Sequence, residues 1–73
     1  MKIMVQDRDA VIDVTNADIF TSDDGVWEYV VAVKGSKKYS LGAYMEPGRA
    51  AKELDKIFQY IRTKKDTYIM SRE

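Results

Sequence analysis

The chain has 73 residues, 45% of them hydrophobic, and its 12 basic and 12 acidic side chains leave no net charge. This length supports one hydrophobic core, so we expect a single α+β domain over residues 1–73, and the hydrophobic content excludes a disordered chain. There is no cysteine and no histidine, which excludes disulfides, thiolate metal sites and the commonest general base.

A domain this small has a narrow stability margin, because it buries only about 60% of the surface of its unfolded chain. We therefore expect either tight packing or self-association to add stability. No apolar run approaches the roughly 20 residues that cross a bilayer, and residues 1–7 lack the features of a secretory signal. We expect a cytoplasmic protein with no membrane partner.

Charge is distributed unevenly along the chain. Residues 1–33 carry two basic and seven acidic side chains, a net charge of −5, whereas residues 34–73 carry ten basic and five acidic side chains, a net charge of +5. Such asymmetry can steer a partner toward the domain. It can equally attract two copies of the chain to each other, in a head-to-tail or a dimeric contact.

Short apolar runs separated by turn residues predict five strands before a single helix. The strands are expected over residues 2–6, 10–15, 17–22, 26–34 and 38–44. Pro47 and Gly48 precede a helix that reaches about Arg62, and residues 68–70 follow as a short strand. The predicted fold is an antiparallel β-meander of about five strands, with one amphipathic helix on one face and a short C-terminal strand.

The registers of two hairpins decide which side chains share a face of the meander. We expect an odd-length loop in both hairpins, because this choice gathers the apolar side chains on one face. Tyr29 then lies opposite Ile19 in the first hairpin and opposite Ala43 in the second, where Val31 lies opposite Leu41. The odd-numbered residues of the central strand are therefore expected to face the helix.

Apolar residues at helical spacing predict the side of the helix that packs on the sheet. The expected stripe consists of Ala50, Leu54, Ile57 and Ile61, widened by Ala51 and Phe58. We expect it to cover the face formed by Trp27, Tyr29, Val31 and Leu41.

The even-numbered face of the sheet is the candidate protein interface, because a helix covers one side only. Its apolar residues include Phe20, Val26, Val30 and Tyr44. Either the N-terminal strands fold across this face, or another chain does, which would be a second copy in a homo-oligomer or a different protein.

Residues 39–61 resemble small proteins encoded by phages and mobile elements of Gram-positive bacteria. The strand end Leu41-Gly42-Ala43-Tyr44 reads LGxY, and the helix from Arg49 to Ile57 reads RAxxxLxxI. Residues 45–48 differ from the linker of those relatives, which more often carries Ser, Asp or Glu, so helix capping is expected to differ. The family has no established activity, and the resemblance implies a fold and a genomic setting.

The chain offers little catalytic or metal-binding chemistry. Asp7, Asp9, Asp23 and Asp24 fall in turns where aspartate is common, without the further ligands of a calcium loop. The serines and Thr21 have no histidine to activate them. We expect no enzyme, no cofactor and no metal.

Basic residues suggest an alternative function in nucleic-acid binding. If the hairpin and the helix were adjacent, they would form a track for phosphates with an aromatic ring for stacking. The candidate contacts are Lys34, Lys37, Lys38, Tyr39, Arg49, Lys52 and Lys56. The pI of about 6.2 lies well below the value above about 9 that is typical of nucleic-acid-binding domains. We therefore favour a non-enzymatic protein-interaction module of phage or mobile-element origin, with a homodimer as one form.

Overall fold

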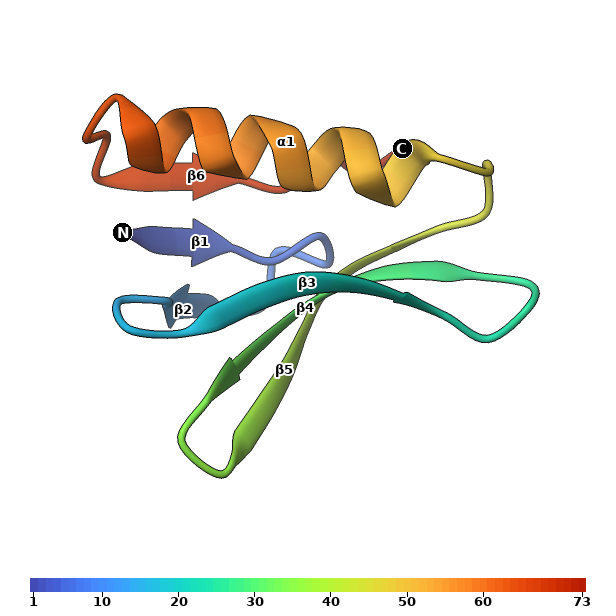
Figure 1. Ribbon diagram of the computed structural model, residues 1–73, viewed down its shortest axis with the longest axis horizontal. Helices are drawn as coiled ribbons and strands as arrows, with labels where there is room; N and C mark the ends of the chain where they lie inside the picture. The colour runs from blue at the N-terminus through green and yellow to red at the C-terminus, as the bar shows by residue number, and fades with distance from the viewer.

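The computed structural model describes residues 1–73 and contains six strands and one helix (Figure 1). In chain order these are β1 (Lys2–Met4), β2 (Val11–Asp13), β3 (Asp18–Asp23), β4 (Glu28–Lys34), β5 (Lys37–Tyr44), α1 (Arg49–Arg62) and β6 (Thr67–Ile69). The predicted α+β class, the single helix and the short C-terminal strand are confirmed. The 14-residue α1 has neither the length nor the apolar character of a membrane-crossing helix.

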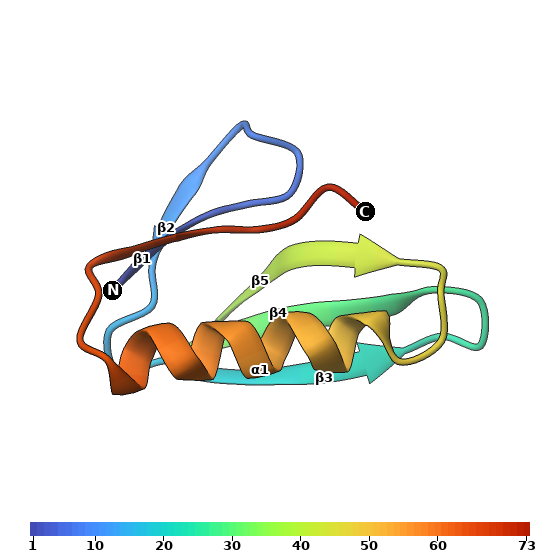
Figure 2. The same cartoon turned by 90° about the horizontal axis from the view of Figure 1, so that it is seen from above.

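The strands form two three-stranded sheets, ordered β2-β1-β6 and β3-β4-β5. The expected meander therefore continues only through β3, β4 and β5. β1 instead pairs in parallel with β6, where Ile3 lies opposite Tyr68, and a partner so far along the chain leaves no local sign in the sequence. Figure 2 shows α1 lying over β3 and β4, with β1, β2 and the red C-terminal strand β6 drawn on the side of β5 away from α1.

A β-bulge gives the β4–β5 hairpin two registers. Next to the turn the loop has two residues, and Gly35 supplies the positive φ of 63° that such a loop requires. Val31 therefore lies opposite Ser40, and its predicted pairing with Leu41 is wrong. Leu41 is then an extra residue that shifts the register by one, so that Ala43 lies opposite Tyr29 as predicted.

The β3–β4 hairpin has a four-residue loop that one carboxylate organises. The carboxylate of Asp24 accepts hydrogen bonds from the backbone N–H of Trp27 at 2.8 Å and of Val26 at 2.9 Å, and from the hydroxyl of Tyr29 at 2.8 Å. These bonds, that of Trp27 first, hold the pKa of Asp24 below its ordinary value. The longer loop places Tyr29 opposite Ser22, so the predicted three-residue loop and its register are wrong.

The longer loop moves β3 by one residue relative to β4, so that Phe20 shares a face with Val31 and not with Val30. Val30 and Ala32 of β4 are fully buried beneath α1, whereas Trp27 remains partly exposed. The expectation that odd-numbered residues face the helix is therefore wrong. Of the even-numbered set the chain itself covers Val30, Ala32 and Tyr44, whereas Phe20 and Val26 remain exposed. The core consists of Ile3, Val5, Val14, Val30, Ala32, Leu41, Tyr44, Ala50, Ile57, Tyr68 and Met70.

The helix is rotated relative to the prediction. Its buried residues are Ala50, Glu53 and Ile57, so a charged residue occupies the central core position. Ala50 and Ile57 are buried as predicted, but three members of the predicted stripe are exposed: Ala51, Phe58 by 56% and Ile61 by 46%. The prediction failed because a glutamate in the core requires partners from other elements, which the spacing of apolar residues does not reveal.

A residue of the sheet caps the N-terminus of α1. Gly48 precedes the helix with a φ of 82° and has no side chain to offer, so the carboxylate of Glu28 accepts hydrogen bonds from the N–H of Gly48 at 3.0 Å and of Ala50 at 3.4 Å. Such a carboxylate satisfies unpaired N–H groups and is favoured by the helix dipole.

Removing this cap is expected to have a measurable cost. We expect Glu28→Ala to lower the free energy of unfolding by about 1 kcal/mol, measured by urea denaturation. The matched control is Glu46→Ala, which removes an equal charge close to the same helix end but no side-chain hydrogen bond, and should cost less than about 0.5 kcal/mol. Equal costs for the two variants would show that charge alone accounts for the effect.

Candidate interaction surface

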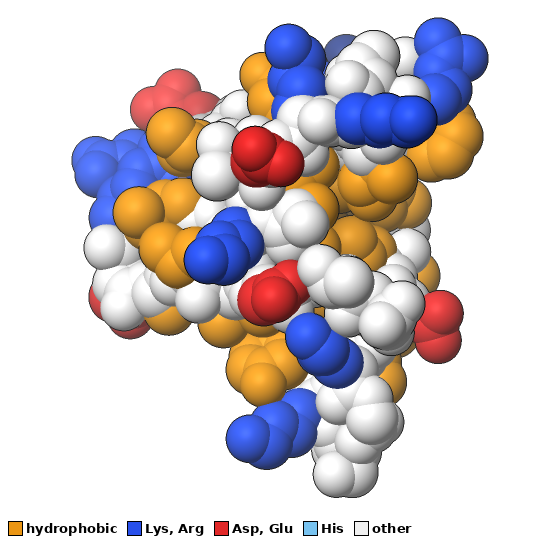
Figure 3. Space-filling view, turned by 90° about the vertical axis from the view of Figure 1, so that its left-hand side faces the viewer, with side chains coloured by type: hydrophobic (Ala, Val, Ile, Leu, Met, Phe, Trp, Pro, Cys, Tyr) orange, Lys and Arg blue, Asp and Glu red, His pale blue; other side chains and the backbone are white.

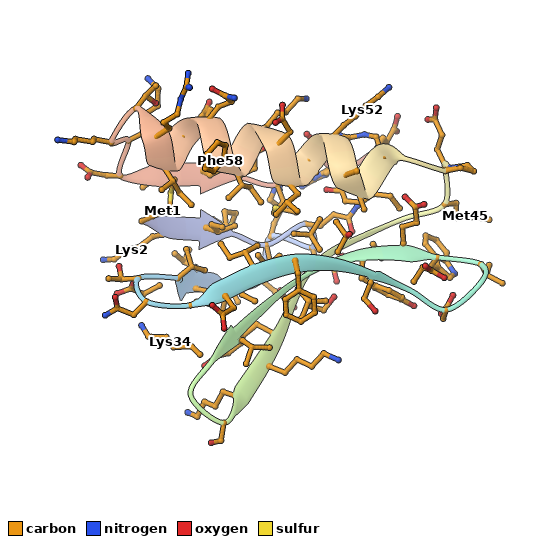
Figure 4. The ribbon with its side chains drawn as sticks, in the orientation of Figure 1. Met1, Lys2, Lys34, Met45, Lys52 and Phe58 are labelled. Atoms are coloured by element: carbon orange, nitrogen blue, oxygen red, sulfur yellow. The ribbon has the colours of Figure 1, made fainter.

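A mostly apolar groove runs between α1 and the edge strand β3. Its lining side chains are Ile19, Ala51, Leu54, Asp55 and Phe58, around a hollow of about 390 Å³, and we call it the α1–β3 groove. Phe58 projects from the front of α1 in Figure 4. A large aromatic side chain this exposed, beside other apolar groups, is typical of a protein-binding surface.

The helix exposes this apolar stripe because a different stripe fills the core. Ala50, Glu53 and Ile57 face inward, and Leu54 and Phe58 each follow an inward residue by one position. One position corresponds to about 100° around a helix, which turns Leu54 and Phe58 toward the flank of α1 and toward β3. α1 is therefore apolar over a wider arc than the core requires.

The other wall of the groove has an unpaired backbone. β3 has β4 on one side and no strand on the other, so part of its N–H and C=O groups can still pair with an added strand. β3 and α1 run in opposite directions along the same length of the molecule (Figure 1). The free strand edge and the apolar stripe thus form one continuous surface.

Charged side chains lie at both ends of the groove. Asp23 and Asp24 lie where β3 ends, and a small hollow there is lined by Asp23 together with the start of α1. At the other end Arg62, Lys64 and Lys65 lie exposed where α1 ends, and Asp18 lies exposed where β3 begins. Figure 3 looks at the molecule from this second end and shows Lys and Arg side chains gathered at the top, with apolar side chains beside and below them.

The four residues predicted as a protein interface separate into two groups. Phe20 and Val26 are exposed, and their part in binding stays a prediction. Val30 and Tyr44 are buried in the core, so the prediction is wrong for them, because Ile3, Val5 and Val14 of the N-terminal segment pack in the same cluster together with α1. Tyr44 donates a hydrogen bond to the carbonyl of Ser71 at 2.7 Å, and its burial raises the pKa of its hydroxyl to about 12.

The predicted basic residues do not form one track. Lys34, Lys37 and Lys38 lie at the β4–β5 hairpin with the half-buried Tyr39, whereas Lys52 and Lys56 are exposed on α1. Figure 1 places this hairpin and α1 at opposite ends of the molecule, and Figure 4 shows the same separation for the labelled Lys34 and Lys52. The expected adjacency of hairpin and helix is wrong, and nucleic-acid binding by either group stays a prediction.

Arg49 is occupied by contacts within the chain. Its guanidinium donates hydrogen bonds to the carboxylate of Glu53 at 2.8 Å and to the carbonyl of Glu73 at 2.7 Å. It also lies 4.8 Å from the centre of the Tyr44 ring, within the range of a cation–π contact. Arg49 therefore holds the C-terminal segment against α1 and is poorly available to a phosphate.

Glu53 is the buried polar centre of the fold, and the sequence patterns missed it. Its carboxylate accepts hydrogen bonds from Arg49, from the Tyr68 hydroxyl at 2.7 Å and from the Ser71 N–H at 2.8 Å. Its position three residues after Ala50 and four before Ile57 was the available signal, but Leu54 gives a more apolar stripe in the same window. Every polar atom of Glu53 has a partner, so this site is structural.

No group of three or more metal-ligating side chains lies together in the molecule. Comparisons with protein families, with curated proteins and with solved structures found no match. The function must therefore be inferred from the chemistry of the surface. The most distinctive part of that surface is the α1–β3 groove.

Proposed function

We propose that this chain is a non-enzymatic protein-interaction module that binds a protein chain at the α1–β3 groove. The supporting observation is the exposed apolar stripe of α1 beside the free edge of β3. An apolar groove next to an unpaired strand suits a protein segment, because the strand edge offers hydrogen bonds while the groove takes apolar side chains. The resemblance of residues 39–61 to phage and mobile-element proteins supports an origin in a phage or a mobile element.

The experiment is a selection of random peptides displayed on phage against the immobilised wild-type protein. We expect enriched peptides whose binding weakens by at least about tenfold when Phe58 is replaced by aspartate, since large aromatic side chains dominate the energy of such contacts. Binding of single peptides is then measured by fluorescence polarisation.

The matched control is Val26→Asp, which introduces the same charge at another exposed apolar residue, in the β3–β4 loop. It should leave binding of the selected peptides unchanged. Failure to enrich any peptide would contradict the proposal, and so would peptides whose binding is insensitive to Phe58→Asp.

A further inference from the structure

The free edge of β3 presents the backbone groups of every second residue. The N–H of Asp24 donates to the carbonyl of Trp27 at 3.1 Å and so continues the β3–β4 ladder beyond the strand end. Because hydrogen-bonded pairs alternate in an antiparallel ladder, the even-numbered residues of β3 direct their N–H and C=O groups to β4. The residues that direct these groups outward are Ile19, Thr21 and Asp23.

This edge lacks the features that usually block an edge strand. β3 is six residues long, contains neither lysine nor proline, and pairs with β4 without a bulge. The opposite edge of the same sheet is covered by Gln6, whose side chain accepts the N–H of Ala43 at 2.7 Å and donates to its carbonyl at 2.9 Å. The chain therefore covers the β5 edge from within and leaves the β3 edge open to a strand of another molecule.

The charges of β3 disfavour a second copy of this chain as the added strand. Asp18 and Asp23 lie at the two ends of β3. Antiparallel pairing of two β3 strands would set Asp18 of one near Asp23 of the other, and in-register parallel pairing would set each aspartate beside its own copy. Like charges opposite each other destabilise a sheet, so a strand from another protein fits this edge better.

The side chains beside the open edge define the chemistry of that strand. Ile19 lines the hollow with Leu54 and Phe58, so a residue opposite Ile19 on the α1 face must be apolar. Asp55 lines the same hollow and is exposed, and it forms no ion pair within the chain. Asp23 adds a second carboxylate beside the start of α1. A basic side chain on the α1 face would meet this unpaired negative charge.

The end of the groove where β3 begins does not select a charge, because its charges are mixed. The exposed charged residues there are Asp18, Asp66, Arg62, Lys64 and Lys65. The requirement for a basic residue is therefore confined to the part of the groove beside Asp55 and Asp23.

We propose that the occupant of the α1–β3 groove is an extended segment of another protein that pairs with β3 as a fourth strand of the sheet. It carries an apolar side chain opposite Ile19 and a basic side chain beside Asp55. This inference rests on the proposed function, since it names the conformation and chemistry of the partner at the same surface. Backbone pairing supplies affinity in this mode, and every second side chain of the segment reaches the α1 face and supplies specificity.

The first test removes one outward N–H from the protein. Thr21→Pro deletes an N–H that does not bond to β4, and proline is tolerated on an edge strand at such a position. We expect this variant to bind the selected peptides at least about tenfold more weakly, by fluorescence polarisation. The matched control is Thr21→Val, which keeps the N–H and the branched shape and should bind unchanged. Equal binding by the two variants would overturn the inference.

The second test uses the wild-type protein, so it does not depend on the folding of a variant. Each backbone amide of a selected peptide is N-methylated in turn, which removes one N–H at a time. In an added strand every second N–H faces β3, so losses of at least about tenfold should alternate along the peptide. Losses without this alternation, as a bound helix would give, would overturn the inference.

The third test concerns the basic side chain. Asp55→Lys should weaken peptide binding by about threefold or more. The control is Asp9→Lys, which reverses an exposed carboxylate in the turn between β1 and β2, away from the groove. Binding that is the same for both variants would overturn the basic character of the segment.

The two proposals fail in distinguishable ways. If peptide binding depends on Phe58 but is unaffected by Thr21→Pro and by N-methylation, the groove remains the binding site and only the added strand is wrong. If sedimentation velocity up to about 500 μM shows a dimer that Thr21→Pro abolishes, a second copy is the occupant and the inference alone is wrong. If no peptide is enriched and the wild type stays monomeric, both proposals are wrong.

Discussion

Replacing Glu53 with alanine is expected to lower the free energy of unfolding by about 3 kcal/mol or more. The variant leaves the hydroxyl of Tyr68 and the N–H of Ser71 without their acceptor, and leaves Arg49 without its ion pair. A domain of this length has a total stability of roughly 4–11 kcal/mol, so the loss is a large fraction of the whole. Urea denaturation followed by circular dichroism measures it.

The control for this variant is Asp55→Ala, which removes an exposed carboxylate two residues further along α1. It should change the free energy of unfolding by less than about 0.5 kcal/mol. A small cost for Glu53→Ala would mean that water replaces the lost carboxylate without penalty, which contradicts its role as the polar centre of the fold.

Glu53 also makes stability depend on pH. Burial by itself raises the pKa of Glu53, but the hydrogen bonds from Ser71, Tyr68 and Arg49 together hold it below its ordinary value. A carboxyl group with a lowered pKa contributes stability that is complete above its unfolded pKa of about 4.3 and is lost as the pH falls through its folded pKa. Wild-type stability should therefore decrease below about pH 4 more steeply than that of Glu53→Gln, as measured by urea midpoints at several pH values.

Replacing Ile57 with alanine is expected to lower the free energy of unfolding by about 2–5 kcal/mol. Ile57 is 1% exposed and packs in the core beneath α1, so the smaller side chain leaves a cavity. Ile61 is the matched control, because it is the same residue type on the same helix, one turn further along.

Ile61→Ala should cost less than about 1 kcal/mol, since Ile61 is already 46% exposed. Both measurements are made at low micromolar concentration, where association contributes little. Similar costs at the two positions would contradict the rotation of α1 and would restore the stripe that the apolar spacing predicts.

The positions of the strands and of the helix followed from local patterns. Alternation of apolar residues, turn residues such as Gly35 and Gly48, and helical spacing over 49–62 all act within a few neighbouring positions. For this reason the predicted bounds of β3, β4, β5 and α1 agree with the structure to within one or two residues.

The candidate site was only partly predictable, and one reason is the β3–β4 loop that Asp24 organises. Its carboxylate organises a four-residue loop, which moves β3 by one residue relative to β4 and places Phe20 and Val30 on opposite faces of the sheet. Val30 and Tyr44 lie in the core because α1 and the N-terminal segment cover them, whereas Phe58, which the helical spacing placed in the core, is 56% exposed at the groove.

The sequence by itself determined the α+β class, the order of the elements and the separation of acidic and basic halves, because each depends on composition or on near neighbours. Only the tertiary structure decided which face of the helix is buried. That choice rests on Glu53, whose partners Tyr68 and Ser71 come from the far end of the chain. Burying its carboxylate with those partners rotates α1 and leaves Phe58 and Ile61 exposed.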